Sequence, residues 1–212
     1  AEHGAKIANL CAVAAALIDY TVLAFAGWTL LCHAAVFSDA SLVALLWAAA
    51  LAGAAALAAA ARGARLPAEP SRLGSRQERA LWGLCVLGAA AVLLAHRPDS
   101  DDGLYIGFAG GVADSPRAPL LKFDALHGIP GLPILMSTYR FHSIEALYGA
   151  VSYLTGAGVL AVSHLLSAPF WGFLAPLAWA RLFRVLSPDR WLWGAAAAVG
   201  FLADDGVGLQ PE

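Results

Sequence analysis

The feature that most constrains this chain is a set of apolar runs that are long enough to cross a lipid bilayer. One of them, from Leu42 to Ala61, contains no charged residue. A helix needs roughly 20 apolar residues to span the hydrocarbon core, and a backbone in lipid must satisfy its own hydrogen bonds. Hydrophobic residues make up 60% of the chain and charged residues only 13%, about half the charged fraction of a typical soluble domain. The sequence therefore predicts an all-α fold, a polytopic membrane helix bundle.

About five spans are predicted, and together they form a single membrane domain over residues 1–212. They cover residues 7–37, 42–61, 81–95, 159–182 and 191–203, of which the last is the shortest. Cys11, Cys32 and Cys85 all fall within these spans, so we expect packing residues and not a disulfide framework.

The arginines predict the orientation. Residues 62–79 and 181–190 are both rich in arginine, and by the positive-inside rule both segments lie in the cytoplasm. We therefore expect a multi-pass protein of the cell (plasma) membrane with a cytoplasmic N-terminus and an extracytoplasmic loop over residues 96–154. A net charge of −2 gives no indication of a nucleic-acid partner.

The extracytoplasmic loop carries most of the polar chemistry. Asp99, Asp101 and Asp102 follow the third span directly, and the apolar residues after them recur at helical spacing. A second amphipathic helix is predicted over residues 144–154, along the membrane interface.

This order resembles the GT-C class of membrane glycosyltransferases, which use polyprenyl-phosphate-linked sugars. In that class the first large extracytoplasmic loop carries an acidic motif at the start of a juxtamembrane helix, often followed by an aromatic residue. The matching residues are Asp101 and Asp102, with Tyr105 as the aromatic, and Asp99 and Asp101 fit a loose DxD pattern. The class usually has more spans than this chain, so we expect either the N-terminal part of a longer protein or an uncharacterised relative.

The resemblance implies a site and its partners. Asp101 or Asp102 would take the proton from the acceptor hydroxyl, and Asp99 and Asp101 would hold a divalent cation, Mg²⁺ or Mn²⁺. A polyprenyl-phosphate sugar donor and membrane lipid would be the partners. Substrate or phosphate contacts would come from loop residues, namely Arg97, Tyr105, Lys122, His127, Arg140 and His142.

Each of these residues also has a structural interpretation. The aspartate pair is equally typical of a helix cap at a membrane boundary. His127 and His142 are typical hydrogen-bonding residues of a loop, Asp124 can stabilise a turn, and Arg140 can pair with Glu145.

Asp19 and His164 are the candidate polar residues within the predicted spans. A carboxylate in a span is a functional candidate because it is costly to bury there, although a hydrogen bond to a neighbouring span would make it structural. Asp19 and the proline-containing fourth span favour one alternative function, a transporter or channel subunit. A non-catalytic membrane scaffold is the other alternative, and the sequence does not predict an oligomeric state.

Overall fold

The computed structural model describes residues 2–62, 75–95, 100–124, 127, 129, 131–134 and 137–204. Regular structure in this part of the chain is helical, apart from two isolated β-bridges. The predicted all-α fold is therefore confirmed.

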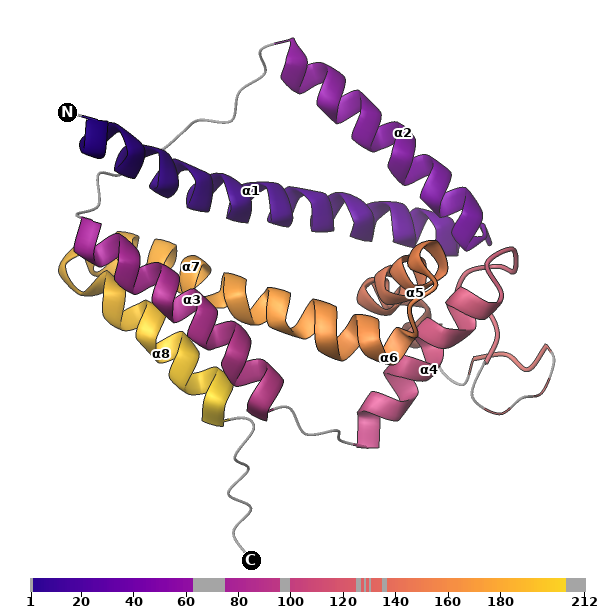
Figure 1. Ribbon diagram of the computed structural model, residues 1–212. Coiled ribbons are helices and arrows are strands. Elements are labelled where there is room, and N and C mark those ends of the chain that lie inside the picture. Colours follow the sequence, from indigo (N-terminus) through magenta and orange to yellow (C-terminus); the bar gives the residue numbers. More distant parts are fainter. Residues whose placement is uncertain are drawn as a thin grey trace, which may run out of the picture. The chain divides into compact units, whose positions relative to one another are not determined.

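The long helices correspond to the first four predicted spans (Figure 1). They are α1 (Glu2–Phe37), α2 (Leu42–Ala61), α3 (Ser75–Ala95) and a continuous helical segment made of α6 (Val159–Ala161), a π-helical turn (Val162–Ser167) and α7 (Ala168–Leu186). Within the described residues, four segments are long and apolar enough to cross a membrane: Ala16–Phe37, Leu42–Ala61, Arg76–Leu94 and Val159–Leu186. This fits a multi-pass membrane protein.

The fifth predicted span is also a helix, but it is short. It corresponds to α8 (Trp191–Asp204), whose 14 residues fall below the roughly 20 residues that a membrane crossing needs. Two further helices, α4 (Ser100–Asp114) and α5 (Ser143–Thr155), form within the predicted extracytoplasmic loop. Both loop helices were predicted from helical spacing, and Gly156 ends α5 with a left-handed φ of 72°.

The chain divides into two compact units. Unit 1 contains the part of α1 up to Val22, together with α3 and the chain from His164 to the end of α8. Unit 2 contains α1 from Leu23 onward, α2, α4, α5 and the chain up to Ser163.

In unit 1, α3, α7 and α8 pack side by side (Figure 1). Gly88 of α3 lies against Gly172 and Pro176 of α7, and Val92 lies beside Gly172, so α3 and α7 are antiparallel. A Cβ atom added at Gly172 would lie 2.7 Å from the carbonyl oxygen of Gly88. Small residues thus let the two backbones touch, as is common between membrane helices.

Described arginines from both arginine-rich segments lie at one end of unit 1. Arg76 and Arg79 open α3, while Arg184 near the end of α7 lies over the ring of Trp191 at 4.6 Å from its centroid. Because α3 and α7 are antiparallel, these ends coincide, as the positive-inside prediction requires. The side of the membrane on which they lie stays a prediction.

Replacing Gly88 or Gly172 by alanine should destabilise unit 1, because each new methyl group would meet the facing backbone. We expect the free energy of unfolding to fall by about 1–3 kcal/mol, as for other overpacked contacts. Thermal unfolding of the detergent-solubilised protein measures this loss.

Gly83→Ala on the same helix is the matched control, because a Cβ atom there has nothing within 4 Å. Alanine is a better helix former than glycine, so this variant should be as stable as the wild type or slightly more stable. Equal effects of all three substitutions would contradict the close α3–α7 contact.

Candidate functional site

The loop that follows α4 is fixed by backbone hydrogen bonds to the turn between α1 and α2 and to the start of α2. The amide of Leu120 donates to the carbonyl of Ala40 over 2.8 Å, and the amide of Val43 donates to the carbonyl of Pro116 over 3.1 Å. Leu120 and Leu121 are buried in the same core as Leu42 and Leu45 of α2. The helix-connecting turn and the loop after α4 therefore form one structure.

The second half of α1 is fixed to the start of α5. The indole N–H of Trp28 donates to the carbonyl of Ser143 over 2.7 Å, and His33 Nε2 lies 3.3 Å from the carbonyl oxygen of Phe141. Gly149, in the middle of α5, lies against α4, where an added Cβ atom would come 2.7 Å from the carbonyl oxygen of Ala109. Within unit 2, α5 thus contacts both α1 and α4.

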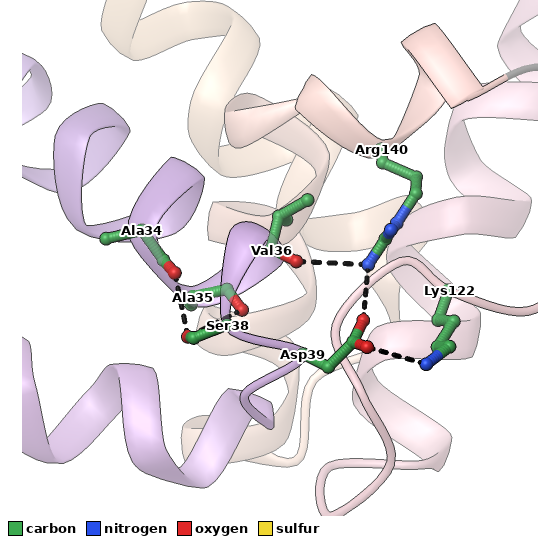
Figure 2. A network of polar contacts seen from close by, with 7 residues as sticks. All are labelled: Ala34, Ala35, Val36, Ser38, Asp39, Lys122 and Arg140. Carbon is green, nitrogen blue, oxygen red and sulfur yellow. Dashed lines mark hydrogen bonds and ion pairs between the residues drawn. The ribbon is translucent and has the colours of Figure 1, made fainter.

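A charged network lies at the end of α1 (Figure 2). Asp39 accepts a hydrogen bond from Lys122 Nζ over 2.7 Å and one from an Arg140 guanidinium nitrogen over 2.8 Å. The same guanidinium nitrogen also donates to the carbonyl of Val36 over 3.1 Å. The hydrogen bonds from Lys122 and Arg140 hold the pKa of Asp39 below its usual range.

Two of the predicted phosphate-binding residues, Lys122 and Arg140, are therefore brought together. Their shared partner is Asp39, in the turn between α1 and α2, which the arginine-based topology would place on the extracytoplasmic side. The alternative pairing of Arg140 with Glu145 is not what the structure has, since Arg140 binds Asp39.

An aromatic cluster surrounds His142, a third predicted site residue. Tyr105 of α4 stacks on the imidazole with ring centroids 5.2 Å apart, and Phe108 and Tyr139 approach it at 6.0 Å and 5.6 Å. Tyr105, the predicted aromatic of the acidic motif, thus contacts a residue 37 positions away.

Glu145 lies beside His142, with only 8% of its side chain exposed. Its Oε2 atom is 3.4 Å from His142 Nδ1 and has no well-formed hydrogen bond among the described residues. Burial raises the pKa of Glu145 above its usual range, an effect that its own amide and His142 only partly oppose. From the sequence, Glu145 is expected only as a partner for Arg140.

A cavity of about 320 Å³ lies beside the charged network in unit 2. Its walls are mainly apolar and include Leu42, Phe108, Val112 and Leu120, while Lys122 and Asp124 contribute the charged groups. A mainly apolar cavity with a few polar groups is typical of a small-molecule or lipid site. Lys122 is shared by the cavity and the network.

His127 has a structural environment. Its Nδ1 atom is 2.9 Å from Asp124 Oδ2, and its amide donates to Asp124 Oδ1 over 3.2 Å. Asp124 thus stabilises the turn, as the structural interpretation expected, and the imidazole is 65% exposed.

The acidic motif is only partly described. Asp101 and Asp102 lie in the first turn of α4, one helical turn before Tyr105, but their side chains fall outside the described part, as do Arg97 and Asp99. Among the residues that are described, no three His, Cys, Asp or Glu side chains gather as a metal site would require. The divalent cation at Asp99 and Asp101 stays a prediction.

The two candidate polar residues of the predicted spans, Asp19 and His164, lie in unit 1. Asp19 accepts a hydrogen bond from Arg181 of α7, which lies where the predicted fourth span joins the arginine-rich segment 181–190. His164 lies in the π-helical turn before α7. Asp19 and Arg181 thus form an ion pair between α1 and α7.

Comparisons with protein-family models, with curated proteins and with solved structures find no match to this chain.

The burial of Glu145 predicts a pH dependence of stability. A glutamate in the unfolded chain has a pKa of about 4.3. In the folded protein the pKa of Glu145 is higher, so its carboxyl group stays protonated up to a higher pH. Stability should therefore fall as the pH rises through the interval between the two pKa values. Thermal midpoints measured from pH 4 to 8 should show this decline in the wild type and a weaker one in Glu145→Gln.

Asp39→Asn is the control, because Asp39 has the opposite pH dependence. The pKa of Asp39 is lowered, so its ion pairs stabilise the folded protein above about pH 4, and this stabilisation is lost as the pH falls through the folded pKa. The variant should lack that loss at acidic pH. Identical pH profiles for the wild type and Glu145→Gln would contradict the burial of a protonatable Glu145.

The Asp19–Arg181 pair predicts a coupling between α1 and α7. Asp19→Asn should lower the free energy of unfolding by about 1–3 kcal/mol, because Arg181 loses its carboxylate. Asp189→Asn, at an exposed position beyond α7, is the control and should have little effect. In a double-mutant cycle with Arg181→Gln, strictly additive effects would contradict the pairing.

Proposed function

We propose that this protein is a membrane glycosyltransferase that moves a sugar from a polyprenyl-phosphate donor to an acceptor at the extracytoplasmic face. One observation carries the proposal. Four residues that the resemblance assigns to the site, Tyr105, Lys122, Arg140 and His142, belong to one compact unit and contact one another or a shared partner. They come from α4, from the loop after it and from the residues just before α5.

In the proposed reaction, the acceptor hydroxyl attacks the anomeric carbon of the donor sugar while the bond from that carbon to the phosphate oxygen breaks. The hydroxyl proton passes to Asp101 or Asp102, at the start of α4. The lipid phosphate leaves with an additional negative charge, which Lys122 and Arg140 stabilise. A divalent cation held by Asp99 and Asp101 would supply further charge stabilisation.

The position of α4 supports these roles. Its first turn carries the two aspartates, and its next turn carries Tyr105, which stacks on His142. The packing of α4 on α5 thus brings the acidic motif and the start of α5 into one unit. The apolar cavity beside Lys122 is suited to a lipid-linked substrate.

The proposal predicts that Asp101→Asn or Asp102→Asn lowers sugar transfer by a factor of about 10² to 10⁴, the usual contribution of a general base. The assay uses membranes containing the protein and a panel of radiolabelled polyprenyl-phosphate monosaccharides. It measures label transferred from the lipid to polar products.

Asp114→Asn is the matched control, because Asp114 is an exposed carboxylate at the other end of α4. It should transfer sugar at the wild-type rate. Consumption of no donor by the wild type, or equal rates for all the variants, would refute the proposed activity.

A further inference from the structure

We propose that Lys122 and Arg140, with the cavity beside them, form a binding site for a lipid phosphate, and that Asp39 takes the place of that phosphate when the lipid is absent. The inference deepens the proposed function, on which the choice of a polyprenyl chain rests. It assigns Asp39 a role as an internal competitor of the substrate.

The geometry of the network supports an exchange of anions. The two carboxylate oxygens of Asp39 are divided between Lys122 and Arg140, at 2.7 Å and 2.8 Å. A phosphate group also presents several oxygens on one side and accepts the same charge-assisted hydrogen bonds. Replacing one anion by the other would keep both cations bound.

The network carries an excess of positive charge, which favours a more highly charged anion in place of Asp39. Two cations share one carboxylate, so the three side chains carry a net charge of +1. The Nε atom of Arg140 is buried and has no hydrogen-bond partner among the described residues. A doubly charged phosphate would neutralise Lys122 and Arg140 more completely than Asp39 does.

The exposure of the network makes the exchange easy. The side chains of Asp39 and Lys122 are 46% and 39% exposed, and ion pairs exposed to this extent contribute little to stability. Arg140 also donates a hydrogen bond to the carbonyl of Val36, which does not depend on the Asp39 side chain. The guanidinium is therefore positioned by the backbone as well as by its carboxylate partner.

The cavity specifies the rest of the ligand. Lys122 lies in its wall together with one carboxylate, Asp124, and most of the other wall residues are apolar, including Leu120, Phe123 and Ile129. A cation in the wall of a mainly apolar cavity suits a molecule with a phosphate head and a hydrocarbon tail. Inorganic phosphate would leave the apolar walls without a partner.

Asp39→Asn is a favourable test substitution. Asp39 has a φ of 50°, in the left-handed region, which asparagine adopts as readily as aspartate. The substitution removes the charge without straining the turn. If Asp39 competes with the phosphate, the substitution should tighten binding of the lipid phosphate. If Asp39 only holds the two cations in place, the substitution should weaken that binding.

The experiment titrates the purified full chain in detergent with polyprenyl monophosphate, with the corresponding polyprenol and with inorganic phosphate, and follows binding by native mass spectrometry and thermal stabilisation. We expect the lipid phosphate to bind at least tenfold more tightly than either of the other two compounds. Asp39→Asn should tighten its binding roughly three- to tenfold, and Lys122→Ala should weaken it roughly tenfold.

Arg117→Ala is the control, because Arg117 is an exposed cation of the same loop outside the network; it should bind like the wild type. The proposal is overturned if Asp39→Asn weakens binding while the thermal midpoint of the free protein is unchanged. It is also overturned if polyprenol or inorganic phosphate binds as tightly as the lipid phosphate, or if Lys122→Ala behaves like Arg117→Ala.

This test is separate from that of the proposed function, because the probe carries no sugar. Binding with the expected variant pattern but without sugar transfer would support the lipid-phosphate site and refute the transferase. Sugar transfer that is insensitive to Asp39→Asn and Lys122→Ala would support the transferase activity, but it would refute this site and the role of Lys122 in the proposed reaction.

Discussion

Unit 2 depends on the hydrogen bonds between the loop after α4 and the turn after α1. The amide of Leu120 binds the carbonyl of Ala40, and this contact carries Leu120 and Leu121 into the core beside α2. The same contact brings Lys122 to Asp39. Without it, the charged network would lack one of its two cations and the apolar cavity would lack a wall. A short stretch of main-chain pairing thus positions Lys122 for both the charged network and the cavity.

Much of the fold could be predicted because membrane spans are local properties of the sequence. A run such as residues 42–61 indicates a helix whatever the rest of the chain does, and the helical spacing after Asp102 predicted α4 in the same way. The fifth span was a weaker prediction, since α8 is a short helix that packs against α3 and α7. An apolar composition can therefore come from packing against neighbouring helices as well as from crossing the membrane.

The site could be predicted only in part, because its contacts join distant positions. Lys122 and Arg140 were chosen from the sequence for their charge, but Asp39 lies 83 and 101 positions away from them. One available signal was the predicted topology, which put this acidic turn and the basic loop residues on the same side. Arg181 was missed as the partner of Asp19 because a cation near the end of a span was assigned to the adjoining turn. That pairing gives Asp19 a partner on a neighbouring helix.

The π-helical turn at Val162–Ser167 has a consequence for how this segment presents its side chains. A π turn holds one more residue than an α turn, and each residue advances a helix by about 100°. The side chains before the turn are therefore rotated relative to the pattern that α7 would extend backward. Pro169, in the first turn of α7, adds a position that has no amide N–H to donate. No single stripe of residues can run the whole length of Val159–Leu186, so its two parts can meet different surroundings within one continuous span.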